Sequence, residues 1–231
     1  IELKDYDKEF NAIQEQFLQH EIAENGFPDR KTAALVGIAC LASIQTPTEL
    51  TVKLGDSLEK GVSVTEIKET LYQAAPYIGY PKVREALAVV NEALLAKGLE
   101  PEEEGQGTVT AETRFEKGLA VQQQIFGKEN INGMRAAAPE DVKHIQDCLS
   151  AHCFGDYYTR GTLDLKMREL VTFTAIISIG GCEPQAKAHA AANLSVGNTK
   201  ADLIAVITTC LPYIGYPRTL NALSCVNEVC K

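Results

Sequence analysis

Apolar residues recur along this chain at the three- and four-residue spacing of amphipathic helices. In TEIKETLYQAA, residues 65–75, one stripe holds Ile67, Leu71 and Ala74 or Ala75, and Thr65 can cap the start. The segment KVREALAVVNEALLAKG, residues 82–98, has the same pattern and stops at a glycine. Strand alternation bounded by hairpin turns is absent from the sequence. The pattern therefore predicts an all-α fold.

The second half of the chain repeats this organisation. LDLKMRELVTFTAIISIGG, residues 163–181, predicts a long, mostly apolar helix that ends at two glycines. EPQAKAHAAANLSVG, residues 183–197, predicts a helix with Pro184 in its first turn and Gly197 at its end. The apolar run is too short to cross a bilayer and is interrupted by Thr and Ser, so no membrane partner is expected.

An internal duplication accounts for the similarity of the halves. The hexapeptide PYIGYP occurs at residues 76–81 and again at 212–217, an offset of 136 residues. The same offset pairs Gly61 with Gly197, and the residues 90–92 (VNE) with 226–228. Identities that keep one register on both sides of a hexapeptide indicate a duplicated unit. The predicted fold class is therefore a duplicated helical bundle.

The stretch between the copies reads as a linker. Residues 98–112 are acidic, contain several glycines and have almost no apolar content after Leu99. We therefore expect a first, diverged repeat at residues 1–97, called the first copy, and a second at residues 113–231, called the second copy. The second copy is expected to carry the functional site. PYIGYP itself is either a structural helix junction or a place where its tyrosines, such as Tyr213, line a pocket.

Charge and cysteine content narrow the class of protein. The 231 residues carry a formal net charge of −9 and contain no basic groove or arm, so no nucleic-acid partner is expected. Seven cysteines, an odd number, mostly in apolar contexts, favour a reducing compartment, and we expect the cytoplasm. The charged amino-terminal residues do not resemble a signal peptide, although removal of a leader before residue 1 is left open.

The segment GGCEPQAKAHAAAN, residues 180–193, is the main candidate for chemistry. It places Cys182, Gln185 and His189 at i, i+3 and i+7, along one face of a helix. Cys182 lies near a helix start, where the helix dipole favours a thiolate. His189 can exchange a proton with a substrate or with Cys182. The alternative is that Cys182 is only a small residue that fills the turn, and that His189 forms its contacts within a packed interface.

Two further charges accompany this segment. Glu169 lies within the apolar helix, where a carboxylate either pairs with a cation or serves proton chemistry. Arg160, in the loop before that helix, can bind an anionic substrate or order the loop. One cysteine and one histidine are too few ligands for zinc, so no metal and no other cofactor are expected. His152 and Cys153 are interpreted as packing residues.

These motifs resemble the carboxymuconolactone decarboxylase family, which also contains alkylhydroperoxidase D. The similarity rests on FGDYYTRGTLDLKMRELVTFTAIISIGGCEPQAKAHAAANLSVGN followed by LPYIGYPRTLNAL, and covers nearly all of residues 150–230. The resemblance implies an all-α protein that assembles as a homo-oligomer, a trimer or a dimer of tandem chains. It also implies a small-molecule substrate and no cofactor.

The resemblance suggests which residues act. The peroxidase branch has a glutamate followed by C-x-x-C-x-x-x-H, and the matching positions are Glu169, Cys182, Gln185 and His189. Glutamine replaces the second cysteine, which breaks the dithiol cycle of that branch. At the offset of 136, the first copy has other residues at these four positions: Ala33, Thr46, Glu49 and Lys53.

Three functions follow as hypotheses. The first is a decarboxylase acting on a small carboxylated lactone, with His189 handling the proton and with Gln185, Arg160 and Tyr213 binding the substrate. The second is a thiol-dependent peroxidase that uses Cys182. The third is a helical scaffold that has lost its chemistry.

Overall fold

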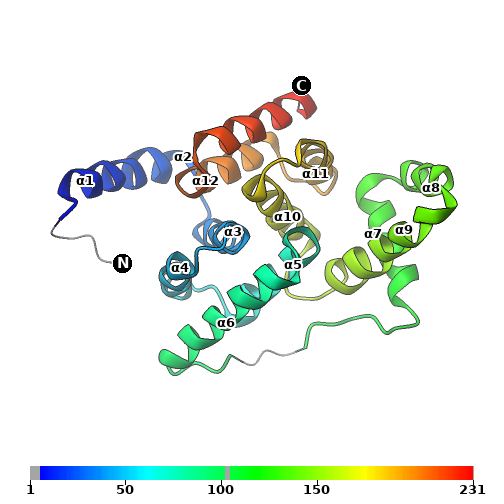
Figure 1. The fold of residues 1–231 in the computed structure, drawn as a ribbon, viewed down its shortest axis with the longest axis horizontal. Coiled ribbons are helices and arrows are strands. Elements are labelled where there is room, and N and C mark those ends of the chain that lie inside the picture. The colour runs from blue at the N-terminus through cyan, green and yellow to red at the C-terminus, as the bar shows by residue number, and fades with distance from the viewer. Residues whose placement is uncertain (1–5, 102–104, 231) are drawn as a thin grey trace.

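The computed structural model describes residues 6–101 and 105–230, and these residues form an all-α fold. The prediction of helices throughout is confirmed, and the described residues contain no β-strand. Nor does any helix among them have the length and apolar character needed to span a bilayer. Figure 1 shows α10 at the centre of the molecule, in contact with helices from both halves of the chain.

The helices of the first copy are α1 (Lys8–Gln16), η1 (Phe17–Ile22), α2 (Ala23–Asn25), α3 (Arg30–Ser43), α4 (Pro47–Glu59), α5 (Val64–Ile78) and α6 (Tyr80–Ala96). The second copy has α7 (Arg114–Phe126), α8 (Lys128–Ala137), η2 (Glu140–Val142), α9 (Lys143–Cys148), η3 (Leu149–Tyr158), α10 (Leu165–Ile179), α11 (Glu183–Ser195) and α12 (Lys200–Val229). The elements η1 and η3 are π-helices, and η2 is a 3₁₀-helix.

The duplication is visible in the backbone at the offset of 136. Helices α4 and α11 have corresponding bounds, and α12 begins at the counterpart of the first residue of α5. The junction glycines Gly79 and Gly215 have positive φ angles of 87° and 72°, a region that glycine enters without a Cβ clash. Capping boxes start both α5 and α12. PYIGYP is therefore a sharp helix junction in both copies.

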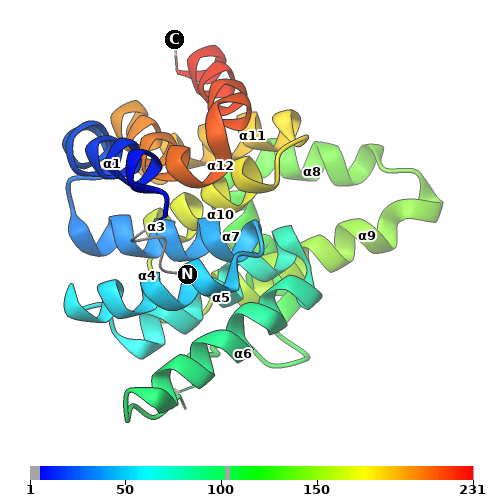
Figure 2. The same ribbon diagram turned by 60° about the vertical axis from the view of Figure 1, so that its left-hand side comes forward.

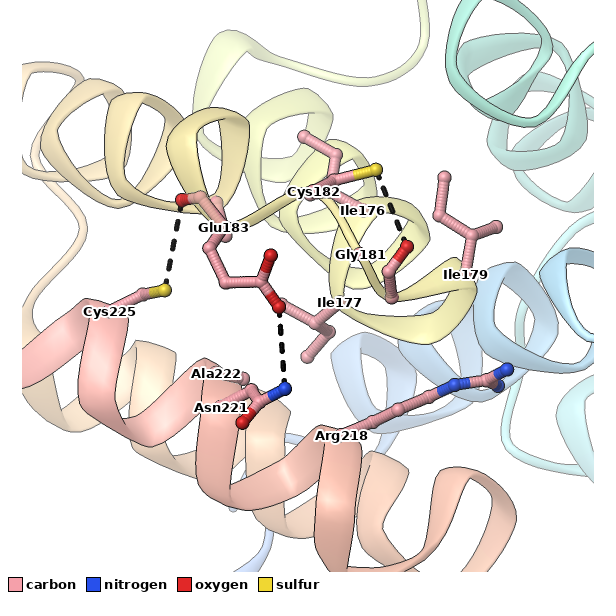
Figure 3. A pocket seen from close by; sticks show the side chains of 12 residues that line it. Ile176, Ile177, Ile179, Gly181, Cys182, Glu183, Arg218, Asn221, Ala222 and Cys225 are labelled. Atoms are coloured by element: carbon pink, nitrogen blue, oxygen red, sulfur yellow. Dashed lines mark hydrogen bonds between the residues drawn. The ribbon is translucent and has the colours of Figure 1, made fainter.

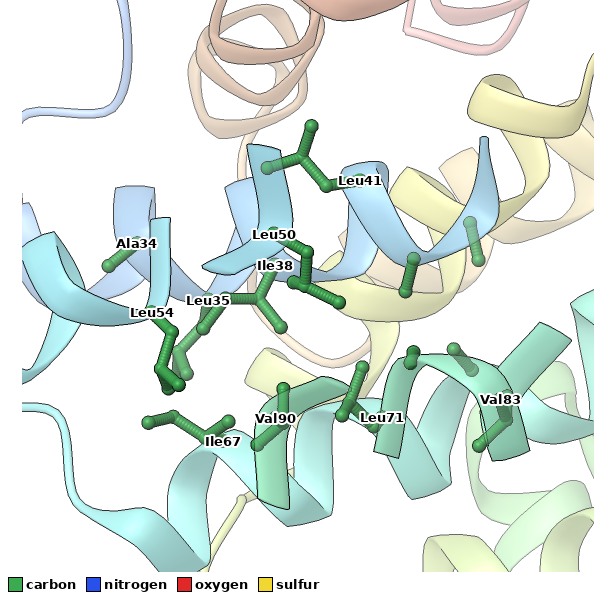
Figure 4. Packing of buried hydrophobic residues seen from close by; sticks show 14 of the residues in the cluster. Ala34, Leu35, Ile38, Leu41, Leu50, Leu54, Ile67, Leu71, Val83 and Val90 are labelled. Carbon is green, nitrogen blue, oxygen red and sulfur yellow. The ribbon is translucent and has the colours of Figure 1, made fainter. Parts of the chain in front are cut away.

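Helices α3 and α10 form the centre of the core, because their sequences are apolar on nearly all sides. Leu35 and Ile38 of α3 pack against α4, α5 and α6 (Figure 4). The opposite side of α3 contributes Val36 and Cys40 to a second cluster, built mainly by α10, α11 and α12. A helix that is apolar all round has to be buried on all sides. The two copies therefore share one continuous interior.

The segments that lead into the central helices cross between the copies. Helix η3 of the second copy contacts α5 of the first, and η1 of the first copy contacts α12 of the second. Each contact is the counterpart of the other at the offset of 136. Each copy therefore supplies a π-helix to the other copy's half of the molecule, and this exchange determines which residues meet at the candidate site.

Helix α7 packs closely along η3. A Cβ atom added to Gly118 would collide with the carbonyl oxygen of Ser150 and with the backbone of Gly155. A Cβ added to Gly155 would collide with the carbonyl of Arg114. The Arg114 Nε also donates to Asp156 Oδ1 over 2.7 Å. The two glycines thus allow backbone contact between the helices, while α8 and α9 project away from the core (Figure 2).

The segment predicted as a linker has hydrogen bonds where it is described. Gly161 donates its N–H to the Gln106 carbonyl over 3.0 Å, and Thr108 donates its hydroxyl to the Thr159 carbonyl over 2.7 Å. Residues 102–104 lie outside the described residues. The division into 1–97, 98–112 and 113–231 stays a prediction, with the end of the linker lying against the loop before α10.

The glycine contact leads to a stability prediction. Gly118→Ala should lower the free energy of unfolding by about 1–3 kcal/mol, because α7 must move away from η3. The matched control is Gly133→Ala on the exposed face of α8, where an added Cβ meets no atom within 4 Å. That change should raise stability by about 0.5–1 kcal/mol, since alanine is the better helix former. Urea denaturation measures both, and an unchanged or higher stability in Gly118→Ala would contradict the close packing.

Candidate functional site

A buried carboxylate–imidazole pair lies at the centre of the second copy. Glu169 of α10 is fully buried, and its Oε2 lies 2.8 Å from Nδ1 of His189 on α11. The turn at Gly180 and Gly181, both with positive φ, folds α11 back along α10 and so brings the two side chains together. Asn193 reinforces the pairing by donating to the carbonyl oxygens of both residues. The predicted candidates Glu169 and His189 therefore meet.

The pairing sets the role of each imidazole nitrogen. An ionised carboxylate can only accept hydrogen bonds, so Nδ1 of His189 carries the proton that faces Glu169. The other nitrogen, Nε2, is then the one that can exchange a proton with another molecule. The pair is therefore arranged for proton transfer at Nε2.

Two tyrosines and a cysteine extend the pair. Tyr158 of η3 donates its hydroxyl to Glu169 Oε1 over 2.7 Å. The Tyr158 hydroxyl also lies 3.0 Å from that of Tyr77, to which the Cys153 thiol donates over 3.5 Å. Burial raises the pKa of both tyrosines well above the usual value and raises the pKa of Cys153 to about 12. All three groups therefore stay protonated at neutral pH.

Aromatic rings enclose the imidazole of His189. The ring of Tyr77, from α5 of the first copy, meets it edge-on with 5.3 Å between centroids. Phe126, at the end of α7, approaches from another direction at 5.4 Å. As a result His189 is only 7% exposed. The site combines elements of both copies and the helix that packs on η3.

The polar network continues away from His189 into the interface between the copies. Tyr158 bonds Thr172 over 2.9 Å, and Gln73 of the first copy donates to Thr172 over 3.1 Å. Arg168 donates to Gln73 over 2.9 Å and to the buried carboxylate of Glu69 over 3.0 Å. Burial lowers the pKa of Arg168, and the charge of Glu69 opposes that shift. A guanidinium nevertheless stays charged in a protein, so this is a buried ion pair.

Arg160 lies at the far end of this network. Its Nε donates to Glu69 Oε1 over 2.9 Å, and its guanidinium carbon lies 5.2 Å from the centroid of the Tyr72 ring. Its side chain is 19% exposed. Glu69 is therefore shared by two guanidinium groups, and a substrate carboxylate that binds Arg160 has to compete with it.

The other predicted site residues lie elsewhere. Cys182 lines a cavity of about 360 Å³ between the start of α11 and the second half of α12, and Figure 3 shows it there with Glu183, Asn221 and Cys225. Neither Glu169 nor His189 belongs to that lining. Gln185 is exposed on α11. Tyr213 is half-buried beside Lys53 of the first copy.

Sequence reasoning missed three members of the site and offered a fourth, Tyr77, only as one of the hexapeptide tyrosines that could line a pocket. Tyr158 and Cys153 lie on the π-helix η3, and the interpretation of Cys153 as a packing residue did not foresee its bond to Tyr77. Phe126 comes from outside the recognised motif. Tyr77 belongs to PYIGYP, so the functional interpretation of that hexapeptide was the available signal. Its contact with His189 of the other copy was not foreseen.

The arrangement can move protons, and its described residues offer no metal-binding cluster. No group of three or more His, Cys, Asp or Glu side chains in residues 6–101 and 105–230 is placed to hold a metal ion. The donor set at His189 consists of one imidazole, one carboxylate, two phenols and a protonated thiol.

Comparison with known proteins gives the family. The sequence profile of the carboxymuconolactone decarboxylase family matches residues 8–92 and 144–228, which repeats the offset of 136. A protein of Acinetobacter baylyi named 4-carboxymuconolactone decarboxylase is 28% identical over 120 residues, which is 52% of this chain and 89% of that protein. Helix α7, which covers His189, lies outside both matched segments. The chain therefore belongs to the carboxymuconolactone decarboxylase family and carries its unit twice.

Proposed function

We propose that this protein is a decarboxylase that acts on a small carboxylated lactone, with His189 as its proton donor. The buried pair of Glu169 and His189 is the observation that carries the proposal. The name of the Acinetobacter baylyi relative, 4-carboxymuconolactone decarboxylase, supports the substrate class. The relative is similar over about half of this chain, so the substrate is part of the proposal.

The chemistry needs one proton at one carbon atom. When the substrate's C–C bond to its carboxylate breaks, carbon dioxide leaves and the electron pair stays on the remaining carbon as a carbanion or enolate. Protonated His189 donates the Nε2 proton to that carbon and becomes neutral. It then regains a proton from water. Glu169 keeps the ring oriented throughout.

The hydrogen bonds to the Glu169 carboxylate support this role. Tyr158 donates to one oxygen of the carboxylate while His189 occupies the other, so the carboxylate cannot rotate away. The high pKa of Tyr158 keeps that hydroxyl a donor and prevents it from competing as an acid. Substrate contacts by Arg160 and Gln185 stay part of the proposal. We also propose that the protein forms a homo-oligomer of tandem chains and is located in the cytoplasm.

A second function is favoured by one specific observation. Cys182 and Cys225 line the same cavity beside the start of α11. Two thiols that line one cavity could reduce an organic hydroperoxide to an alcohol and water, with both sulfur atoms oxidised to a disulfide and an external dithiol restoring them. In the peroxidase branch the second cysteine stands at the position of Gln185. Here the partner thiol would instead be Cys225 of α12.

The decarboxylase proposal predicts a strong dependence on His189. His189→Gln should lower kcat for 4-carboxymuconolactone by about 10²–10⁴-fold, because the acid at the reacting carbon is lost. Glu169→Gln should also lower kcat by at least about tenfold, because the imidazolium loses its counter-charge. His144→Gln changes an exposed histidine and serves as the control, which should turn over the substrate at the wild-type rate.

Turnover is measured by the loss of the substrate's ultraviolet absorbance together with the release of carbon dioxide. Circular dichroism confirms that each variant is folded. Full activity in a folded His189→Gln variant would contradict the assigned role. Absence of turnover in the wild type would favour the scaffold hypothesis or the thiol chemistry.

The contribution of the first copy can be tested through Tyr77. Tyr77→Phe keeps the ring beside His189 but removes the hydroxyl that bonds Tyr158 and Cys153. We expect a loss of about 0.5–1.5 kcal/mol in stability and a measurable fall in kcat. Tyr216→Phe removes an exposed hydroxyl from the same hexapeptide of the second copy and serves as the control. Equal behaviour of the two variants would argue against a role for Tyr77.

The thiol alternative predicts an activity that depends on Cys182 and Cys225. Reduction of tert-butyl hydroperoxide, followed by consumption of dithiothreitol, should be lost in Cys182→Ser and in Cys225→Ser. The exposed Cys148→Ser is the control. Peroxidase turnover that survives in Cys182→Ser, or none in the wild type, would rule out this alternative.

A further inference from the structure

The first copy contains a counterpart of the candidate site in which the polar residues are replaced. At the offset of 136, Ala33 of α3 stands for Glu169, Lys53 of α4 for His189, and Ile22 of η1 for Tyr158. Tyr213 of α12 stands for Tyr77 and, like it, comes from the opposite copy. The same helices therefore frame both places, one in each copy.

The replacement leaves a cavity where the second copy is filled. A cavity of about 500 Å³ is lined by Ile22, Ala33, Lys53 and Tyr213, which are the counterparts of Tyr158, Glu169, His189 and Tyr77. Ala33 ends at its Cβ, so this position carries no counterpart of the Glu169 carboxylate. Thr209, which also lines the cavity, likewise replaces the longer Gln73.

Positive charge gathers around this cavity. Lys53, Lys60 and Arg30 contribute to its lining. Asp56 lies next to them, with its Oδ2 at 3.2 Å from the Lys53 Nζ and 2.8 Å from the Lys60 Nζ. Two ammonium groups thus share one carboxylate, which is itself 39% exposed, and Arg30 adds a third positive charge. Together these four groups have a net charge of +2, which the nearby carboxylate of Glu49 reduces to +1.

The surrounding structure makes room for the Lys53 side chain. A Cβ atom at Gly37 would lie 2.5 Å from the Lys53 Cε, so the glycine lets the lysine stem cross the surface of α3. The counterpart of Gly37 in the second copy is the fully buried Phe173. Tyr213 also lines the cavity, and burial raises its pKa to about 12, which keeps its hydroxyl protonated.

We propose that this first-copy cavity binds a small organic carboxylate. The ligand's carboxylate takes the place that the Glu169 side chain has in the second copy and pairs with Lys53. An apolar body fits the rest of the cavity, where Leu18, Phe27 and Pro212 lie. In the second copy His189 pairs with Glu169. In the first copy Lys53 stands in place of the histidine, and Ala33 supplies no carboxylate in place of the glutamate. This binding site is independent of the decarboxylase proposal, because it does not include His189.

Isothermal titration calorimetry of the full chain with benzoate tests the site. Benzamide, which has the same shape but no charge, should bind at least tenfold more weakly. Lys53→Met should weaken benzoate binding at least tenfold. Binding should also weaken between 50 and 300 mM salt, because the attraction is electrostatic.

Ala33→Glu is the sharpest variant, because it restores the missing carboxylate. The new side chain should fill the cavity, pair with Lys53 and abolish benzoate binding. His189→Gln should bind benzoate like the wild type, which separates this site from the second copy's. Lys128→Met, an exposed lysine on α8, is the charge control.

Four outcomes would overturn the proposal. They are no heat of binding in the wild type at millimolar benzoate, equal affinity for benzamide, unchanged affinity in both Lys53→Met and Ala33→Glu, and loss of binding in His189→Gln. Circular dichroism shows whether Ala33→Glu is folded. If it is not, Lys53→Met together with the benzamide comparison still decides the question.

Discussion

The buried carboxylate of Glu69 constrains the rest of the structure. It belongs to the first copy, yet it lies between Arg168 and Arg160 of the second. Removing these charges from water costs several kcal/mol per ion, so they are tolerated only where their hydrogen bonds are satisfied. Arg168 meets that condition by also donating to Gln73 and to the backbone carbonyls of the loop before α10. These bonds fix α5 in one register against α10.

That register positions the candidate site. Helix α5 carries Glu69 and Gln73 at the interface and Tyr77 one turn further on, where it reaches His189. On α10, the neighbouring residues Arg168 and Glu169 point to different partners, the first to α5 and the second to α11. The interface between the copies and the pair of Glu169 and His189 are therefore parts of one polar network. A tandem chain ensures that both halves of this network are present together.

The two copies use one scaffold for two different interiors. In the second copy, a carboxylate, an imidazole and two phenols fill the space between the helices, and Phe126 covers them. In the first, small and aliphatic residues leave a cavity with lysines at its edge. The helix junctions and capping boxes keep their geometry in both copies, although the residues of the two interiors differ.

The sequence was sufficient to predict the helices and the duplication, because local periodicity and the offset of 136 encode them. It named Glu169 and His189 as candidate residues, but it left open whether they meet. It could not predict the exchange of η1 and η3 between the copies, which depends on long-range packing. Tyr158 and Phe126 were missed for that reason. The spacing that aligned Cys182 with His189 was misleading in one respect: Cys182 lies at the start of α11, as predicted, but it lines a cavity that includes neither His189 nor Glu169.

A double-mutant cycle between Glu69 and Arg168 tests the central claim most directly. Glu69→Gln, Arg168→Met and the double variant are compared by urea denaturation of the full chain. Each single change should cost about 3–5 kcal/mol, because it leaves a buried charge unpaired. The double variant should cost less than the two together, with a coupling energy of at least about 1 kcal/mol. Costs that add to within about 0.5 kcal/mol would contradict the account, since the two side chains would then act independently.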